Sequence, residues 1–405
     1  MAGPLEGIRI LDVTWAVAGP FGTMTLCDLG AETIKVERPG TGDVLRSHIP
    51  FLEGLSLYFA SINRGKKGIA IDLKTEGGKA LFLDLVKQVD ILVENFVPGT
   101  MDRLGVGYEV LKKNNPRLIY AACSGFGQTG PYREKPALDI IAQGMSGMMS
   151  ITGEEGGPPV RVGVSIGDIV AGLFLAIGIL SALIERQKSG LGQMVDVSML
   201  DGQVAILENA LVRYLNIGEV PQRIGTRHPL VAPFQAFQTK DGYIVLSAAG
   251  GIEQWAVFTE LIGRPELLSD ERFQDPGSRT KHHKVLEPIL VEAMKEKTTK
   301  EWIAEFEPVG IPCGPLNSIP EAAADPQILH REMFVVVSDY KQRKLKMCNT
   351  PIKLSRTPAK LEKGAPGLGE HTHEVLSAMF GVDEAKIEAL EASGAIASLQ
   401  PHDEL

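Results

Sequence analysis

The sequence predicts an α/β protein whose N-terminal part is built around a parallel sheet. Two short β-branched segments, Ile8–Val13 and Glu32–Glu37, flank a segment with helical spacing at Thr23–Leu29. Two strands joined through a helix form a βαβ unit, which favours parallel pairing and places ligand-binding loops after the carboxyl ends of the strands. The pattern continues along the chain, with strands predicted at Gly68–Asp72, Ile91–Glu94, Leu118–Ser124 and Gln193–Ser198 and a helix at Glu76–Gln88.

The most apolar segment, Ile169–Ile184, is predicted to form a buried core helix. Only Gly172, Gly178 and Ser181 interrupt it, and it ends in the polar segment Glu185–Gly190. A helix over this segment would extend about 24 Å, less than the membrane hydrocarbon core of about 30 Å. The length therefore predicts a core helix and no membrane span.

Asp168 directly precedes this helix, at the end of a loop rich in glycine and proline. The spacing favours a helix N-cap, in which the side-chain oxygen accepts hydrogen bonds from the first free N–H groups. The same position would also hold an ionised carboxylate at the rim of a pocket, where it could attack an acyl carbon. Both interpretations are open from the residues alone.

The segment Gly125–Gly130 matches the G-x-G-x-x-G pattern of dinucleotide-binding loops. That pattern requires a helix to start at its third glycine, but Pro131 and Pro136 follow closely and interrupt helical hydrogen bonding. The context weighs against a nicotinamide-binding site.

Two domains are predicted: a large one at 1–220, completed by 329–405, and a smaller α+β domain at 225–328. Helices at Asp139–Met149 and Asp201–Val212 complete the first block, and the pattern changes after Gly218. The second block begins with a strand at Tyr243–Ser247 and continues with helices through Phe306. The returning segment is predicted to contain strands at Phe334–Val337 and Lys344–Met347 and a helix at Asp383–Ala392.

Composition narrows the class of protein. With 405 residues, 44% hydrophobic and 22% charged, the chain is long enough for two or three globular domains. A net charge of −9 disfavours nucleic acids and anionic membranes as partners. The N-terminus lacks the features of a signal peptide, so a cytoplasmic location is expected. The cysteines form no C-x-x-C pair, which argues against a metal site or a disulfide framework: Cys27, Cys123, Cys313 and Cys348.

Several short motifs, in this order and spacing, resemble the class III CoA-transferase family, of the formyl-CoA transferase and carnitine-CoA transferase type. The resemblance covers nearly the whole chain and is carried by Leu11–Thr14, Ala18–Pro20, Leu29–Glu32, Ile34–Pro39, Val93–Phe96 and Thr129–Pro131. It implies a large Rossmann-like domain closed by both chain ends, a small domain and an interlocked homodimer, with pairing to a homologous subunit left open. It implies no prosthetic group, because a coenzyme A thioester is the substrate.

The resemblance also assigns the catalytic residues. Asp168 would be the nucleophile, forming first an aspartyl–acyl anhydride and then an aspartyl-CoA thioester. Gly250 and Gly251 match a glycine-rich loop that folds over this aspartate, excludes water and offers N–H groups to an oxyanion. The alternative from the residues alone is a plain strand–helix turn.

The resemblance places coenzyme A along the strand ends of the large domain. Taken singly, each basic residue there is more often part of a solvated surface, but their recurrence at strand ends favours a phosphate-bearing ligand. The residues implied are Val17, Ala18, Arg38, Ile71, Asp72, Leu73, Lys74, Asn95, Phe96 and Arg103.

Within the family, Gly225–His228 and Pro233–Tyr243 are most similar to enzymes that move CoA between dicarboxylic acids. We therefore expect succinyl-CoA as donor and a short diacid as acceptor, of the malate, citramalate, mesaconate, itaconate or glutarate type. The distal carboxylate of such an acid needs a cation, because burying it unpaired would cost several kcal/mol. The candidates are Arg46, Arg227 and His228, each of which could instead form a surface or interface ion pair.

Three alternatives remain. CoA transfer between two carboxylates of one molecule would use the same residues. An α-methylacyl-CoA racemase shares the fold but needs an acid/base pair, and the racemase-type histidine before Asp139 is replaced by Leu138, which cannot take a proton. A noncatalytic CoA-binding protein is disfavoured because Asp168 and the glycine pair are intact.

Overall fold

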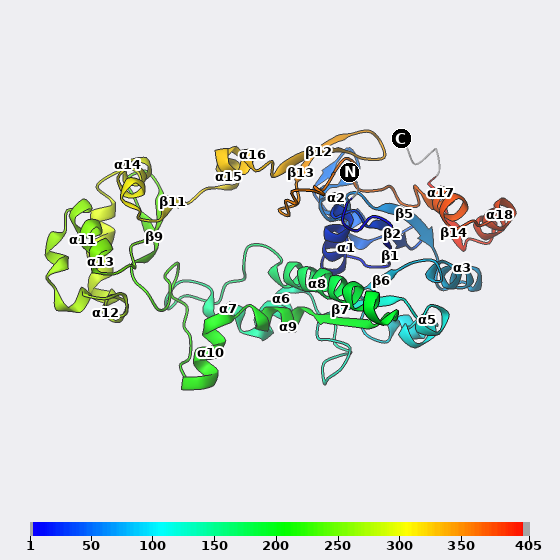
Figure 1. Ribbon diagram of the computed structural model, residues 1–405, viewed down its shortest axis with the longest axis horizontal. Coiled ribbons are helices and arrows are strands. Elements are labelled where there is room, and N and C mark those ends of the chain that lie inside the picture. The colour runs from blue at the N-terminus through cyan, green and yellow to red at the C-terminus, as the bar shows by residue number, and fades with distance from the viewer. Residues whose placement is uncertain (1–2, 400–405) are drawn as a thin grey trace. The chain divides into compact units, whose positions relative to one another are not determined.

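Seven strands form the main sheet of the computed structural model, which describes residues 3–399 (Figure 1). Their order is β14-β5-β2-β1-β6-β7-β8, and every neighbouring pair is parallel except β14 with β5. The predicted parallel α/β sheet is therefore confirmed. The strand bounds are β1 Arg9–Asp12, β2 Glu32–Glu37, β5 Lys67–Ile71, β6 Ile91–Glu94, β7 Ile119–Ser124, β8 Met194–Ser198 and β14 Ile396–Ala397.

Helices cover both faces of this sheet, because successive strand residues point to opposite sides. In β1, Leu11 packs in a core with the helices α3 (Glu76–Val86), α5 (Tyr108–Asn114) and α18 (Glu384–Ala392). The neighbouring Ile10 faces the other core, which contains α1 (Ala18–Asp28) and α8 (Ile166–Ser189). The unit is a three-layer α/β/α sandwich.

The strand order reverses at β1. The chain runs from β1 outward through β2 to β5 and then returns to the other side of β1 to form β6. Such a switch point opens a crevice outside the carboxyl ends of the two strands, where ligands of open α/β sheets bind. The loops after β1 and β6 therefore border the expected ligand site.

Helix α1 starts at Ala18, five residues before the predicted helix. Gly19 and Pro20 indicate a turn in the sequence, but proline is tolerated in the first turn of a helix, where its missing N–H is not needed. The predicted CoA-binding residues Val17 and Ala18 consequently lie at the N-terminus of a helix.

Helix α8 is longer than predicted at both ends. Its 24 residues extend about 36 Å, so the argument that it is too short to span a membrane was wrong. By length and composition alone it could cross a membrane, and it is the one such helix in the described part of the chain. Its residues Ala171, Leu175, Ile179 and Ala182 pack in the core beneath the sheet, as the prediction of a core helix required.

Two glycines bring α8 and α1 together. A Cβ at Gly172 would lie 2.7 Å from the Ala18 carbonyl oxygen, and one at Gly22 would lie 2.8 Å from the Gly172 carbonyl oxygen. Such short contacts with backbone atoms leave room for glycine alone. Because Gly172 is one turn after Asp168, this contact brings the starts of both helices to the same edge of the sheet.

The helices predicted around α8 are shorter than expected. The helix at Asp139 ends at Ser146, where Gly147 has φ 96°, and the segment after Met199 is divided by Glu208 at φ 51°. The glycine-rich segment Gly125–Gly130 is followed by turn and loop residues through Leu138, so no helix starts at its third glycine, as the prolines predicted. The α-helices not yet named that lie outside residues 219–329 are α2 Leu57–Asn63, α4 Thr100–Arg103, α6 Asp139–Ser146, α7 Met148–Ile151, α9 Met199–Ala205, α10 Glu208–Ile217 and α17 Thr372–Glu374.

A second unit comprises 149–160 and 219–329, and a first unit the rest of the chain. The sequence placed 149–160 in the large domain, but hydrogen bonds tie this loop to the second unit. The Gly225 N–H donates to the Gly153 carbonyl at 2.9 Å, and Arg223 Nε donates to the Gly157 carbonyl at 3.0 Å. Residues distant in sequence make these bonds, so local patterning could not predict them.

The second unit has a three-stranded antiparallel sheet in the order β11-β10-β9. Strand β10 (Tyr243–Ser247) has the predicted bounds, whereas β9 (Phe234–Gln238) was not predicted, because among its residues only Phe237 is buried and no apolar alternation results. The hydrophobic core of the second unit contains Trp255, Phe258 and Trp302. The other elements are α11 Ile252–Leu261, α12 Pro276–Lys281, α13 His283–Met294, α14 Thr299–Phe306, β11 Cys313–Pro315, α15 Ile319–Ala324 and α16 Pro326–His330.

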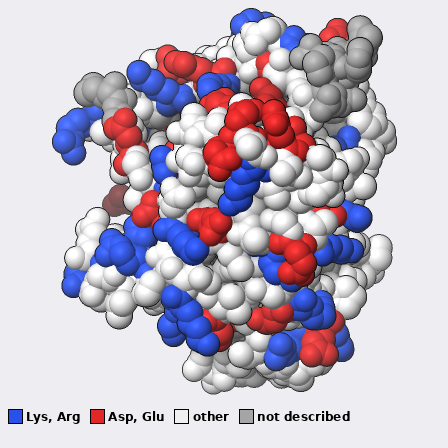
Figure 2. Space-filling model, turned by 90° about the vertical axis from the view of Figure 1, so that its right-hand side faces the viewer, with Lys and Arg blue, Asp and Glu red and all other residues white. Residues whose placement is uncertain are grey.

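The predicted late strands form a hairpin in the first unit, β12 (Phe334–Ser338) with β13 (Lys344–Cys348), and β3 (Phe51–Leu52) pairs with β4 (Leu55–Ser56). Basic and acidic side chains are interspersed over the face drawn in Figure 2, as expected for an ordinary acidic protein surface with a net charge of −9.

Candidate active site

Asp168 lies in the first turn of α8 and is partly buried. It is not the N-cap that its spacing favoured, because the helix begins two residues earlier and Ser165 occupies the capping position. The N–H of the adjacent Gly167 donates instead to Asp139 Oδ1, at 2.8 Å. No residue in the described range 3–399 hydrogen-bonds to the Asp168 carboxylate, so no hydrogen bond stabilises its ionised form.

Burial raises the pKa of Asp168 to about 7, and the negative charge of Asp139 contributes in the same direction. A carboxylate with this pKa is about half ionised at neutral pH, and its ionised form is more basic than an ordinary aspartate, which favours nucleophilic attack. Cys123, on β7, is the neighbouring thiol, and burial followed by the charge of Asp168 raises its pKa far above neutral. Cys123 therefore stays protonated and does not compete as a nucleophile.

The loops after β1 and β6 are tied to each other at the switch point. Asn95 Oδ1 accepts a hydrogen bond from the Trp15 N–H at 2.9 Å, and Asn95 Nδ2 donates to the Trp15 carbonyl at 2.8 Å. The half-exposed Trp15 ring lies 6.4 Å from that of Phe96. Of these two predicted CoA-binding residues, Asn95 thus ties together the loops that form the crevice, and Phe96 borders it.

A buried ionic cluster supports the loop after β1. Asp12 accepts hydrogen bonds from Thr23 Oγ1 at 2.7 Å and Lys66 Nζ at 2.9 Å, as well as from the Thr14 N–H and hydroxyl. Burial alone would raise the pKa of Asp12, but the ammonium groups of Lys66 and Lys35 outweigh it and lower the pKa to about 2. The carboxylate is therefore ionised throughout the neutral range.

Three of the predicted CoA-binding residues are exposed cations in segments that follow strands of the main sheet: Arg38 after β2, Lys74 after β5, and Arg103 at the end of α4, the helix that follows β6. Among the described residues none of the three has an acidic side chain within ion-pair distance, and the Arg103 guanidinium has one hydrogen bond, from Nη2 to Thr100 Oγ1 at 2.8 Å. Unpaired cations at one edge of a parallel sheet suit a ligand with several phosphates.

The other predicted CoA-binding residues have structural contacts. Val17, Ala18 and Ile71 are buried, so they can offer a ligand only backbone groups or a limited apolar surface. The Asp72 carboxylate accepts the Lys74 N–H at 2.9 Å and forms the turn that presents Lys74, while Leu73 packs against the core.

Glu94, which the sequence did not single out, is a buried carboxyl group at the end of β6. It accepts the Phe96 N–H at 2.7 Å and the Tyr120 hydroxyl at 3.4 Å, and burial raises its pKa to about 7. The sequence pattern that could have indicated Glu94 is a charged residue at the end of an apolar predicted strand. Glu94 holds the start of the loop that carries Asn95 and Phe96.

Gly250 and Gly251 follow β10 and precede α11. The Gly250 N–H donates to Gln254 Oε1 at 2.7 Å, and the Gly250 carbonyl accepts from Arg279 Nη2 at 2.7 Å. Arg279, which the sequence did not single out, is fully buried with its guanidinium 4.4 Å from the Trp255 ring centre. The Gly250 N–H is thus already bound and is not free to serve as an oxyanion donor in this conformation. The same role for the Gly251 N–H stays a prediction.

Arg46 is fully engaged within the first unit. Its Nε and Nη2 bind the two carboxylate oxygens of Glu37, both at 2.7 Å, and its guanidinium stacks 3.8 Å from the centre of the Phe59 ring. Since Glu37 is buried, this bidentate pair is a structural contact. The position of Arg46 therefore argues against its use as a substrate-carboxylate ligand.

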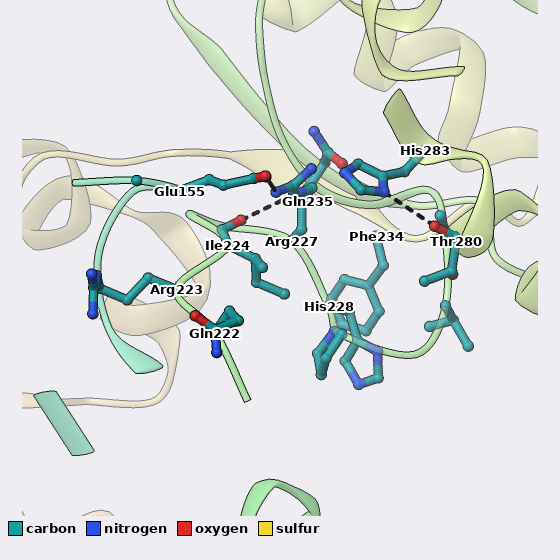
Figure 3. A pocket seen from close by; sticks show the side chains of 14 residues that line it. Glu155, Gln222, Arg223, Ile224, Arg227, His228, Phe234, Gln235, Thr280 and His283 are labelled. Carbon is teal, nitrogen blue, oxygen red and sulfur yellow. Dashed lines mark hydrogen bonds and ion pairs between the residues drawn. The ribbon is translucent and has the colours of Figure 1, made fainter. Parts of the chain in front are cut away.

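Arg227 and His228 line a cavity of about 470 Å³ in the second unit (Figure 3). The Arg227 guanidinium bonds to the half-exposed Glu155 and, at 3.2 Å, to Glu287. The His228 ring stacks on Phe234 with ring centres 5.1 Å apart. The structure brings these two predicted residues together, whereas Arg46 lies in the other unit.

The position expected to hold a racemase histidine is exposed and apolar. Leu138, immediately before α6, is 72% exposed, so it presents no proton donor or acceptor beside Asp139.

Comparisons with known proteins agree on one family. A protein-family model described as CoA-transferase family III matches residues 5–372. The chain is 44% identical to the acetyl-CoA:oxalate CoA-transferase of Acetobacter aceti, over 95% of this chain and 97% of that protein. It is 41% identical to the succinyl-CoA:glutarate CoA-transferase of Mus musculus, over 97% and 90% of the two chains. A crystal structure of a CAIB/BAIF family protein from Brucella suis matches with a TM-score of 0.84 and 38% identity, over 94% and 100% of the two chains.

Proposed function

The chain belongs to CoA-transferase family III, and from that premise we propose that it moves CoA from succinyl-CoA to a short dicarboxylic acid through covalent intermediates on Asp168. The observation that carries the proposal is the Asp168 carboxylate itself, which starts a core helix, accepts no hydrogen bond within the described chain and has a pKa of about 7. The similarity to transferases named for oxalate and for glutarate supports a diacid acceptor.

In the proposed reaction, an Asp168 oxygen attacks the thioester carbon of the donor and the C–S bond breaks. CoA leaves as a thiolate, and a mixed anhydride remains on Asp168. The thiolate then attacks the Asp168 carbonyl carbon, which releases the donor acid as a carboxylate and leaves an aspartyl-CoA thioester. The acceptor carboxylate reverses both steps, so no water or other reactant is consumed.

We assign the CoA phosphates to the unpaired cations Arg38, Lys74 and Arg103, and the pantetheine arm to the switch-point crevice beside Asn95 and Phe96. The geometry favours this because the crevice lies at the edge of the sheet to which the Gly22–Gly172 contact brings the start of α8. The remaining assigned residues, Val17, Ala18 and Ile71–Leu73, form the walls.

Arg227 is the stronger candidate for the distal carboxylate of the acceptor. Of its two partners, Glu155 is half-exposed, and an exposed ion pair contributes only about 0–1 kcal/mol, so a substrate carboxylate can replace Glu155 while Glu287 stays in place. Arg46 has no such exchangeable partner, because Glu37 is buried. His228 would form the adjacent wall of the cavity.

A panel of donors and acceptors tests this proposal. Succinyl-CoA and acetyl-CoA are each offered with oxalate, malate, mesaconate, citramalate, itaconate and glutarate, and products are read by mass spectrometry. We expect succinyl-CoA with one C4 or C5 diacid to give the highest kcat/KM. Arg227→Met should raise the KM for that diacid by about tenfold or more, the effect of losing a charged hydrogen bond. The KM for butyrate, which has no distal carboxylate, should be unchanged.

Arg46→Met is the matched control for the panel. It should lower the melting temperature, because Glu37 would remain buried without its partner, while the ratio of diacid to monoacid activity stays constant. Equal use of acetate, butyrate and diacids by the wild type would refute the diacid assignment. Product formed from a single dicarboxylyl-CoA without any acceptor would identify intramolecular transfer.

The glycine pair supplies a second test. A Cβ at Gly251 would meet no atom within 4 Å, whereas a Cβ at Gly250 would lie 2.5 Å from Gln254 Oε1. Gly251→Val should therefore fold like the wild type. If the loop closes over the reacting aspartate, the variant should transfer CoA more slowly and hydrolyse more thioester per transfer. Gly250→Ala, which displaces Gln254, is the control for local distortion, and an unchanged hydrolysis ratio in Gly251→Val would exclude a guarding role.

We also propose that the active form is a homodimer located in the cytoplasm. Helix α10 supports the dimer, because none of its residues is buried although it carries Val212, Leu215 and Ile217, which are 57–72% exposed. An amphipathic helix of this kind needs a partner to bury its apolar face. The mass in solution, by light scattering, tests for two copies or for a homologous subunit.

A further inference from the structure

Asp139 connects the start of α8 to the loop that leads into it. Its Oδ1 accepts the Gly167 N–H at 2.8 Å, and its Oδ2 accepts Gln143 Nε2 at 2.8 Å. Gln143, which is fully buried, uses its Oε1 to accept the Val162 N–H at 2.9 Å. Arg161 approaches Asp139 Oδ2 at 3.4 Å. The buried Asp139 carboxylate therefore fixes two parts of the chain. It holds the loop before α8 through Gln143, and it holds Gly167, the residue next to Asp168, directly.

This arrangement has an electrostatic consequence for Asp168. A free N–H at a helix start would normally stabilise a nearby carboxylate, but the Gly167 N–H is bound to Asp139. The like charge of Asp139 then acts on Asp168 as well. Other ionisable groups near the start of α8 are Arg161 in the preceding loop, Cys123 on β7, Asp196 on β8 and Asp201 on α9. Of all the neighbouring charges, only that of Asp139 contributes to the raised pKa of Asp168.

We propose that Asp139 is a positioning residue that promotes covalent catalysis by destabilising ionised Asp168 relative to its acylated forms. The proposal rests on the function proposed above. Asp168 carries a charge of −1 as a free carboxylate and none as the anhydride or the aspartyl-CoA thioester. Repulsion from Asp139 is therefore relieved in both intermediates, and the negative charge leaves with the CoA thiolate or the donor carboxylate.

The proposal links two measurable quantities. Repulsion from Asp139 favours protonated Asp168 and acylated Asp168 alike, because both are neutral. Removing the charge should therefore lower the pKa of Asp168 and the equilibrium yield of aspartyl-CoA together. Each unit of lost pKa should correspond to about a tenfold lower adduct constant. A residue with a purely structural role would slow the reaction without coupling these two quantities.

The test uses Asp139→Asn in the full-length enzyme with succinyl-CoA and no acceptor. Asparagine keeps an oxygen for the Gly167 N–H and removes the charge, but its Nδ2 would face Gln143 Nε2, so the hydrogen bond to Gln143 is lost as well. The aspartyl-CoA adduct is quantified by intact-mass spectrometry from pH 5 to pH 9. We expect the acid limb of adduct formation to move to lower pH by about 1 unit, a shift typical of removing one neighbouring charge. At pH 8 the adduct constant should fall about tenfold.

Two further variants control for folding and for charge in general. Asp139→Asn combined with Gln143→Glu reverses the hydrogen bond between the two side chains and restores the charge, so the limb and the adduct constant should return toward the wild type. Asp201→Asn removes an exposed carboxylate from the helix α9 and should leave both unchanged. If Asp139→Asn does not fold, the double variant still reports on the role of the charge.

The outcomes separate this inference from the proposed function. Absence of an Asp168 adduct in the wild type would overturn the covalent mechanism. A wild-type adduct together with an unshifted limb and an unchanged adduct constant in Asp139→Asn would overturn the role of Asp139 alone. If Asp139→Asn reached the same adduct level more slowly and its acid limb did not shift, Asp139 would have only a structural role in the loop.

Discussion

Replacing Asp168 by alanine or asparagine should abolish CoA transfer, with a loss on the order of 10⁴-fold or more, as expected when a covalent nucleophile is removed. The carboxylate accepts no hydrogen bond from the rest of the described chain, so asparagine removes the nucleophile without leaving another group unpaired. Binding of CoA, measured by calorimetry, should be within a few-fold of the wild type because the assigned phosphate ligands lie on other elements.

Trapping identifies the residue directly. Wild-type enzyme incubated with succinyl-CoA and then hydroxylamine should carry a hydroxamate on the peptide that contains Asp168, and the Asp168→Asn variant should carry none. The exposed Asp201, in the first turn of α9, provides an internal control and should stay unmodified. Near-wild-type turnover of the alanine variant would refute a covalent aspartyl intermediate.

Asp12→Ala should lower the free energy of unfolding by about 3–5 kcal/mol, because it leaves a buried ammonium group without its partner. Lys66 is fully buried and would keep only the Pro20 carbonyl and Asn63 Oδ1 as acceptors. Glu32→Ala is the matched control in the neighbouring strand: Glu32 is about one-third exposed and pairs with the partly exposed Arg9 and Lys67, and the loss of each pair should cost about 0–1 kcal/mol. Urea titration of both variants provides the comparison, and equal losses would contradict the argument.

The stabilising effect of Asp12 should depend on pH in a defined direction. Its pKa is about 2 in the folded protein and near 3.8 when unfolded, so between these values the unfolded state binds more protons. The contribution of Asp12 is therefore complete above about pH 4 and is lost as the pH falls through 2. The difference in unfolding free energy between wild type and Asp12→Ala should narrow as the pH falls from about 4 toward 2.

Strands and the candidate nucleophile could be located from local patterns. The segments Glu32–Glu37, Ile91–Glu94 and Tyr243–Ser247 have the predicted bounds, because each is an apolar or β-branched segment ended by a turn. Asp168 was found because it precedes the most apolar segment of the chain. Strand β9 was missed because most of its residues are partly or fully exposed, so it lacks the alternation that burial imposes on a sequence.

The ends of helices and the partners of charged side chains could not be predicted from local patterns. The start of α1 was misplaced because Gly19 and Pro20 are common in turns, and their position in the first turn of a helix is visible only when the helix is built. Arg46 was a reasonable carboxylate ligand from its charge alone. The structure gives that guanidinium a partner, Glu37, which no residue spacing indicates.

The sequence alone determined the α/β class, the position of a reactive aspartate before a core helix and the family to which the chain belongs. The tertiary structure decided how that aspartate is held: Asp139 binds the Gly167 N–H, Arg279 binds the Gly250 carbonyl, and Gly172 lets α1 approach α8. Periodicity and turn residues act between near neighbours in the chain and are therefore written locally in the sequence. Ion pairs, buried hydrogen bonds and close helix contacts join residues far apart in sequence, and they exist only once sheet order and packing have brought those residues together.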